Sequence, residues 1–207
     1  MKVINLTERE SIPAKVYTCN VYLVLGGSNA MEDVNTMVDV GMDPGVMDRI
    51  EAAATGVGKK RVAQVILTHN HFDHAGLLSK VRERFHPMVR AFSAMDGVDQ
   101  TLRDGQKIRM GDREFEVFHT PGHSHDSVCL YCKEDRVLFA GDTPLLIRSG
   151  SATYEDEYVR ALERLAALRI DTIYFGHGEP LTNSASERIR DSLAVIRKSR
   201  QTSSAAG

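Results

Sequence analysis

The sequence contains little cysteine, which fits a protein of a reducing compartment and leads us to expect a cytoplasmic location. Cys19, Cys129 and Cys132 are its three cysteines among 207 residues, so one thiol is left over if any two of them pair. Cys129 and Cys132 have C-x-x-C spacing, but no second C-x-x-C exists to complete a zinc knuckle. They lie in the apolar run SVCLYC, and residues three apart in a strand point to opposite faces. We therefore interpret both as packing residues.

The chain also lacks a surplus of charge of either sign and any long apolar run. Its 26 Lys and Arg residues stand against 28 Asp and Glu residues, which gives a net charge of −2. This balance gives no support for nucleic acid or anionic lipid as the main partner. No segment approaches the ~20 apolar residues that span a bilayer, and the opening MKVINLTERESIP lacks the apolar stretch of a signal peptide. We expect no membrane segment and a small-molecule partner.

Linkers and internal repeats are absent as well, and the pattern that remains is an alternation of strands and helices. The apolar runs predict strands at 14–27, 35–41, 61–68 and 169–178, with four short strands between 106 and 142. Helical spacing predicts helices at 43–55, 76–85, 153–168 and 184–199, and a short helical turn at 93–99. This order predicts one α/β domain over 1–207, with sheets covered by helices. The small, polar tail 200–207 is expected to be disordered.

Residues 68–76, THNHFDHAG, concentrate three of the eight histidines in one short stretch. His69 and His71 are two apart at the end of a predicted strand, so their side chains share a face. Asp73 and His74 follow at once, and a bend of the chain would turn them back over the same strand end. The stretch therefore offers two chelating pairs side by side, and a metal site needs further ligands from elsewhere.

Three later residues repeat one local design, an apolar run followed by a His or Asp beside glycine. They are His123 in TPGH, Asp142 in AGD and His177 in GHG. Glycine next to a ligand lets the backbone turn tightly and leaves room for a substrate. The other histidines, His86, His119 and His125, lack this context and are interpreted as ordinary surface or packing residues, with His125 close enough to His123 to line a pocket.

Taken together, these residues resemble the metallo-β-lactamase superfamily over nearly the whole chain. The segment from His69 to His74 matches the signature H-x-H-x-D-H, and the three later residues match the remaining ligands in order and in context. Asp39, in MVDVG, stands where the family commonly has an Asp after an early strand. The resemblance implies an αββα sandwich, two mixed β-sheets flanked by helices, with the site at one edge of the sheets.

The resemblance also implies a site for two divalent metal ions. His69, His71 and His123 would hold the first metal. Asp73, His74 and His177 would hold the second, and Asp142 would bridge the two. Asp73 and Asp142 would also act in catalysis, while Asp39 would orient a ligand from behind. Five histidines with two carboxylates suit zinc, although iron and manganese fit as well.

The reaction that this site implies is hydrolysis of a small ester, thioester or lactone by a hydroxide bridging the two metals. Proteins of the glyoxalase II type carry an added helical region, which is reduced to one helix here. One alternative is a persulfide dioxygenase with a single iron on the positions of His69, His123 and Asp142. Further alternatives are a phosphodiesterase or nuclease of the same fold and a non-catalytic metal-binding scaffold. Many relatives form dimers, so a homodimer is compatible with the sequence.

Two further residues are weaker candidates for substrate contacts. Tyr174 lies three residues before His177, and Arg148 follows the predicted strand that ends at Asp142. Tyr174 has a competing interpretation as a packed strand residue, since most strand tyrosines pack. Arg148 would meet an anionic part of the substrate.

Overall fold

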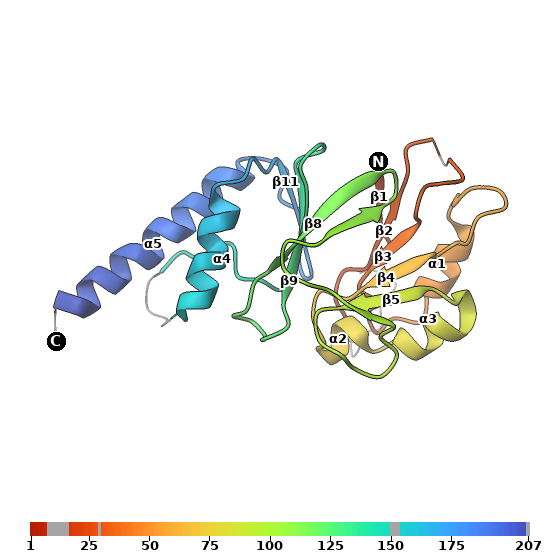
Figure 1. Ribbon diagram of the computed structural model, residues 1–207, viewed down its shortest axis with the longest axis horizontal. Coiled ribbons are helices and arrows are strands. Elements are labelled where there is room, and N and C mark those ends of the chain that lie inside the picture. The colour runs from red at the N-terminus through yellow and green to blue at the C-terminus, as the bar shows by residue number, and fades with distance from the viewer. Residues whose placement is uncertain (8–16, 29, 150–153, 206–207) are drawn as a thin grey trace.

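The computed structural model describes residues 1–7, 17–28, 30–149 and 154–205. Figure 1 shows two β-sheets stacked face to face between two groups of helices. The first sheet has six strands in the order β1-β2-β3-β4-β5-β6. Their bounds are β1 Lys2–Asn5, β2 Tyr22–Leu25, β3 Thr36–Val38, β4 Gln64–Ile66, β5 Met88–Ala91 and β6 Gln100–Thr101. The strands from β3 to β6 are parallel, and β1 and β2 join them antiparallel.

The second sheet has five strands in the order β11-β10-β9-β8-β7. Their bounds are β7 Lys107–Met110, β8 Arg113–His119, β9 Val128–Cys132, β10 Val137–Gly141 and β11 Thr172–Phe175. Strands β7 to β10 pair antiparallel, and β11 adds to β10 in parallel. Strands β8, β10 and β11 therefore end at the same edge of the sheet, which brings the residues that follow them together.

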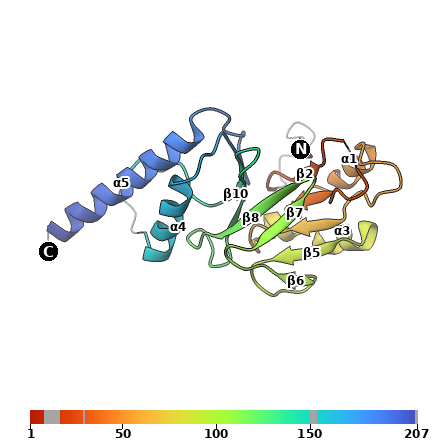
Figure 2. The same ribbon diagram turned by 45° about the horizontal axis from the view of Figure 1, so that its top comes forward.

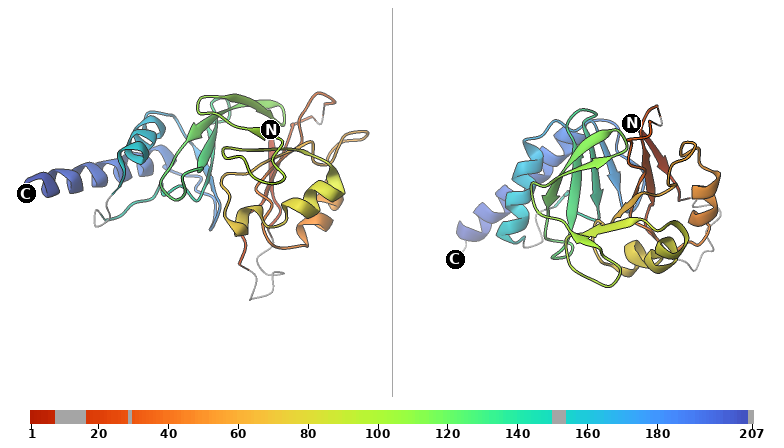
Figure 3. Two further views of the ribbon diagram at one scale, coloured as in Figure 1. Left: turned by 60° about the horizontal axis from the view of Figure 1, so that its bottom comes forward. Right: turned by 45° about the vertical axis from the view of Figure 1, so that its right-hand side comes forward.

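Five helices lie on the outer faces of the two sheets. Helices α1, α2 and α3 lie beside the first sheet, and α4 and α5 beside the second, as Figures 1 and 3 show from different sides. Their bounds are α1 Val46–Ala52, α2 Phe72–Ala75, α3 Leu78–Phe85, α4 Asp156–Ala166 and α5 Ala185–Ala205. Within the described residues, no helix combines the length and the apolarity that crossing a bilayer requires.

Three layers of buried apolar side chains hold the sandwich together. One layer lies between α1, α3 and the first sheet and includes Ile50 and Val81. The middle layer joins the two sheets and includes Phe115 and Phe139. The third lies between the second sheet and helices α4 and α5, and includes Ile189. The predicted αββα sandwich is confirmed, because each sheet buries one face on its partner and the other on helices.

Strand β9 shows why its cysteines are packing residues. Cys129 belongs to the layer under α4 and α5, whereas Cys132 belongs to the layer between the sheets. Both are buried and free. The prediction that they point to opposite faces is confirmed, and they form no shared site.

Several element boundaries differ from the sequence predictions. Helix α1 begins at Val46 rather than at 43, because Asp43 and Pro44 form the turn before it, with the amide of Val46 donating to the carbonyl of Asp43. The strand predicted over 35–41 stops at Val38, since Asp39 and Gly41 adopt positive φ. The short helical turn expected at 93–99 is wrong, and a turn at residues 96–97 stands there. The beginning of the strand predicted over 14–27 and of the helix predicted from 153 lies outside the described residues.

Helix α5 is longer than predicted and corrects the expected disorder of the tail 200–207. It continues to Ala205, because the stretch after Ser199 has no glycine or proline to end it, while residues 206–207 lie outside the described part. Figure 2 shows α5 lying beside α4 and extending beyond the sheets. Arg200 stabilises this extension by donating to the Asp156 carboxylate at 2.7 Å and to the carbonyl of Tyr154.

Candidate metal centre

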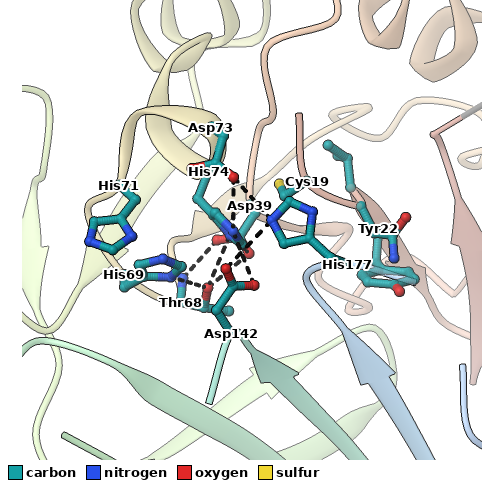
Figure 4. Close-up of polar contacts among 12 residues, drawn as sticks. Cys19, Tyr22, Asp39, Thr68, His69, His71, Asp73, His74, Asp142 and His177 are labelled. Carbon is teal, nitrogen blue, oxygen red and sulfur yellow. Dashed lines mark hydrogen bonds and ion pairs between the residues drawn. The ribbon is translucent and has the colours of Figure 1, made fainter. Parts of the chain in front are cut away.

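The ends of strands from both sheets meet at one edge of the sandwich and bring the predicted ligands together. Asp39 directly follows β3, and His69 lies just past β4. From the second sheet, Asp142 directly follows β10 and His177 lies just past β11. Figure 4 shows most of these side chains converging. The remaining ligand candidates come from the start of α2 and from the loop after β8.

Seven ligand candidates form two groups whose donor atoms lie within 4.8 Å of one another. The first group is His69, His71 and His123, and the second is Asp73, His74, Asp142 and His177. Within the first group, Nε2 of His123 lies 2.9 Å from Nδ1 of His71. Within the second, Nε2 of His177 lies 3.0 Å from Oδ2 of Asp73. The structure thus brings together residues separated by more than 100 positions in the sequence.

Asp142 lies between the two groups. Its Oδ2 is 3.5 Å from Nε2 of His123 in the first group and 3.4 Å from Nε2 of His177 in the second. Its Oδ1 faces Nε2 of His74 at 3.3 Å without the alignment of a hydrogen bond. Burial alone would raise the pKa of Asp142, but the neighbouring His177 and His74 rings hold it well below its usual range. A carboxylate in this position can serve both groups at once.

The hydrogen bonds behind the ligands fix which imidazole nitrogen is free. Thr68 donates its hydroxyl proton to Oδ2 of Asp39 at 2.8 Å, so Nδ1 of His69, 3.1 Å from the same hydroxyl oxygen, must donate to it. Nδ1 of His74 lies 2.8 Å from Oδ2 of Asp39 and donates to that carboxylate. In both rings Nε2 therefore faces the centre, and it is the nitrogen that can bind a metal once it carries no proton.

The electrostatics of the two buried rings differ. Burial lowers the pKa of His69 to about 4, which keeps this ring neutral. Burial would also lower the pKa of His74, but the carboxylate of Asp39 outweighs it and raises that pKa above its ordinary value. Without a cation the centre therefore favours a proton on His74, and cation binding must displace that proton.

The residues present fit the divalent metal ions that the family implies. Nε2 of His69, Nε2 of His74 and Oδ1 of Asp142 are buried and make no hydrogen bond within the described chain. Leaving a buried polar atom unpaired costs about 1–3 kcal/mol, and three such atoms point into one centre. Imidazole nitrogens and carboxylate oxygens are ligands that zinc accepts. A bound cation would satisfy all three atoms.

Asp39 and Cys19 form a third, fully buried group with His74. Asp39 adopts φ 58°, and its carboxylate also accepts the amide of Thr68 at 2.8 Å. It faces Nδ1 of His74, the nitrogen turned away from the other ligand candidates. Burial raises the pKa of the Cys19 thiol to about 12. Without a cation, Cys19 therefore stays protonated at neutral pH.

The two weaker candidates and the remaining histidines are not members of these groups, although His125 lines a cavity beside His123. Tyr174 packs between the sheets, where its ring stacks on Phe139 at 5.0 Å and contacts Tyr22 at 5.1 Å. This is the packing interpretation that competed with a substrate contact. Arg148 is exposed in the loop after β10, and its role toward substrate stays a prediction. His119 stacks on Phe92 at 3.9 Å, outside both ligand groups.

Asn20 is a functional residue that the sequence reasoning missed. It is 2% exposed and lies two residues before β2. Its side-chain amide donates to the carbonyls of Phe175 at 3.0 Å and Gly178 at 2.8 Å, on either side of His177. The Tyr22 hydroxyl donates to the same Phe175 carbonyl at 2.8 Å. The first sheet thus clamps the loop that carries His177 on the second.

The same loop has no room for a side chain at Gly176. A Cβ atom there would lie 2.2 Å from Oδ1 of Asp142 and 2.6 Å from Cε1 of His74. The glycine beside the ligand allows this close approach, as the sequence pattern predicted.

We expect Asn20→Asp to weaken the second ligand group. A carboxylate would face two backbone carbonyl oxygens, so the loop would shift and take His177 with it, at a cost of about 1–3 kcal/mol in unfolding free energy. Metal analysis after loading should then show loss of about one cation per chain relative to wild type. Asn5→Asp, at an exposed position at the end of β1, is the matched control. Full metal content in Asn20→Asp would show that the clamp does not position His177.

Comparison with known proteins agrees with the fold. The sequence profile of the metallo-beta-lactamase superfamily matches residues 14–96 and 89–177. The hydroxyacylglutathione hydrolase of Rhizobium meliloti is 33% identical over 132 residues, which is 60% of this chain and 51% of that protein. The atrochrysone carboxyl ACP thioesterase of Aspergillus fumigatus is 29% identical over 171 residues, covering 79% of this chain and 52% of that protein. The chain thus spans about half the length of these curated relatives.

Solved structures show the same fold. The crystal structure of ETHE1 from Myxococcus xanthus covers 95% of this chain and 85% of its own, with a TM-score of 0.69 and 21% identity. A metallo-beta-lactamase family protein of Thermus thermophilus covers 95% of this chain and 79% of its own, with a TM-score of 0.61 and 22% identity. With the profile match over most of its length, the chain belongs to the metallo-β-lactamase superfamily.

Proposed function

We propose that the chain is a metal-dependent hydrolase with a two-metal centre, acting on a small ester, thioester or lactone. The observation that carries the proposal is the presence of two complete ligand groups that share Asp142. Relatives named as a glutathione thioester hydrolase and as an ACP thioesterase support the reaction class. The ligand set favours zinc.

In this proposal each group holds one cation, with His69, His71 and His123 on the first and Asp73, His74 and His177 on the second. When bound there, two divalent cations would lower the pKa of a coordinated water to about 7 and would polarise the carbonyl under attack. Asp142 would orient that water, because its carboxylate already faces both groups. Asp39 and Thr68 would keep His69 and His74 in the tautomers that bind metal.

The centre also has space beside it for a substrate. A cleft of about 480 Å³ is bordered by His123, Asp142 and His177 and opens to solvent. Its volume lies in the range of small-molecule sites. A substrate in this cleft would reach the edge of the centre where Asp142 lies between the two groups.

The competing function, oxidation at a single iron, uses only part of this centre. His69, His123 and Asp142 would be sufficient to bind one iron, and Asp73 and His177 would then bind no metal. The observed contact of His177 with Asp73 and its proximity to Asp142 favour a second cation. We therefore rank the two-metal hydrolase first.

Metal analysis combined with a substrate panel tests the proposal. We expect about two zinc ions per chain and turnover of thioesters, esters or lactones by the loaded protein, with phosphodiesters cleaved more slowly. One iron per chain with consumption of oxygen would contradict a hydrolase. Two bound metals without turnover of any panel member would indicate a non-catalytic scaffold.

A further inference from the structure

The walls around the metal centre indicate which substrate fits it, an inference that rests on the proposed hydrolase function. Beside the 480 Å³ cleft lies a second cavity of about 350 Å³. Both are lined by His123 and Pro144, so the two hollows adjoin at these residues. A substrate with one substituent, or arm, on each side of its reacting carbonyl could place one arm in each hollow.

The first hollow has largely apolar walls, whereas the second combines apolar side chains with the polar Ser124, His125 and Glu155. Leu145, Leu146 and Phe175 line the first, and Leu146 is 45% exposed. Tyr154 and Tyr158 line the second, with their rings stacked at 5.5 Å. Tyr158 is buried and its hydroxyl donates to the carbonyl of Pro144, so the half-buried Tyr154 ring is the aromatic surface that a ligand would meet there.

Two large aromatic side chains extend the apolar surface at the rim of the centre. Tyr17 is 62% exposed and Phe72 is 64% exposed, with their rings 6.2 Å apart. Tyr17 also stacks on the ring of His177 at 5.2 Å. Exposed aromatic rings that lie together beside a site indicate binding of an apolar partner.

The charges around the hollows also favour an uncharged substrate. Among the described residues that line them, Glu155 and Glu179 carry negative charge and neither Lys nor Arg occurs. Three carboxylates at the centre, those of Asp39, Asp73 and Asp142, would offset most of the charge of two divalent cations. An anionic substrate arm inside the hollows therefore meets like charge, and the nearest predicted cationic contact, Arg148, is not among the residues that line them.

From these surfaces we infer that the substrate is an acyl thioester or ester whose arms are apolar and uncharged. The geometry assigns Tyr17 and Phe72 to contacts with the apolar arm, and Glu179 to the exclusion of carboxylates. This specificity differs from that named for the hydroxyacylglutathione hydrolases, because glutathione carries free carboxylates. It goes beyond the reaction class, which alone leaves the two arms open.

A matched pair of thioesters tests the charge preference of the zinc-loaded protein. S-benzoyl-N-acetylcysteine differs from S-benzoyl-N-acetylcysteamine by one carboxylate on the thiol arm. We expect kcat/KM to be about tenfold higher for the neutral thioester, a difference of ~1.4 kcal/mol. Glu179→Gln should reduce this ratio by about threefold or more, whereas Glu32→Gln, at an exposed position before β3, should leave it unchanged.

The aromatic rim is tested with S-benzoyl and S-acetyl thioesters of the same neutral thiol. Phe72→Ala should lower the benzoyl-to-acetyl ratio of kcat/KM by about tenfold. Met31→Ala removes another large exposed apolar side chain, 69% exposed and before β3, and should leave the ratio unchanged. Calorimetry of metal-free protein with unreactive benzyl thioethers of the two thiols gives a readout apart from turnover, and the neutral thioether should bind more tightly.

The outcomes separate this inference from the proposed function. Equal or better turnover and binding of the carboxylate-bearing compounds would overturn the inference while leaving a hydrolase in place. If the benzoyl-to-acetyl ratio of kcat/KM is unchanged in Phe72→Ala, the aromatic side chains at the rim do not contact the apolar arm of the substrate. Failure of the zinc-loaded protein to cleave any thioester or ester would overturn the proposed function itself.

Discussion

Asp142→Asn is expected to lower kcat by on the order of 10³-fold while the protein stays folded. The substitution removes the negative charge that faces both ligand groups. In the wild type, Oδ2 of Asp142 lies 3.5 Å from Nε2 of His123 and 3.4 Å from Nε2 of His177. The variant has an amide group in place of this carboxylate. The amide N–H cannot bind a cation, so both metals lose a shared ligand. Asparagine has nearly the same shape, and the side chain is 15% exposed, so packing should survive.

Turnover of a thioester, metal content and the thermal unfolding midpoint are the three measurements for this variant. We expect activity and metal content to fall together, with a small change in the unfolding midpoint of the metal-free protein. Asp171→Asn is the matched control, because Asp171 is 56% exposed, pairs with Arg136 and lies before β11, at the other end of that strand. Near-normal turnover by Asp142→Asn would mean that this carboxylate is not shared between two metals.

The three later ligand candidates could be identified from the sequence because each follows an apolar run and lies beside a glycine, and the first four because they cluster in THNHFDHAG. His69 and His71 also reveal themselves by spacing alone, since alternate residues of an extended segment share a face. For Asp142 and His177 the local context of an apolar run and a glycine was sufficient. The structure places these side chains together, and their roles as metal ligands stay predictions until metal content is measured.

The residues that support the ligands could not be found in the same way. Asn20 donates hydrogen bonds to backbone carbonyls more than 150 positions later in the sequence, and no local pattern around Asn20 predicts these acceptors. Thr68 lies next to His69, but its role depends on Asp39 approaching from β3. Contacts of this kind arise from how two sheets stack, which residue spacing within one strand does not determine.

Fold class was easier to predict than element boundaries, for a physical reason. Alternating strands and helices fix which faces must be buried, whereas the last residue of an element depends on competing local contacts. Strand β1, Lys2–Asn5, was missed because its four residues are half-exposed at the sheet edge and give no clear alternation. Helix α5 runs past its predicted end because Arg200 finds partners on the segment that begins α4.

Asp39→Ala is expected to cost about 3–5 kcal/mol of unfolding free energy, because it leaves a buried charge partner uncompensated. Asp39 is 2% exposed and accepts from Nδ1 of His74 and from the amide and hydroxyl of Thr68. Alanine satisfies none of these donors and also tolerates positive φ less well than Asp. Urea unfolding of the metal-free protein measures the loss. A change below about 1 kcal/mol would show that water replaces the carboxylate.

Asp39→Asn separates the role of this residue in stability from its role in metal binding. Asparagine adopts positive φ readily, and its carbonyl oxygen can still accept from the Thr68 amide. Its N–H group, however, would face Nδ1 of His74, so the ring would have to move its proton to Nε2. A proton on Nε2 uses the lone pair that would otherwise bind a metal. Metal affinity should therefore fall by about 10–100-fold, with little change in unfolding free energy. An Asp39→Asn protein that binds two metals normally would show that Asp39 stabilises the fold without setting the tautomer of His74.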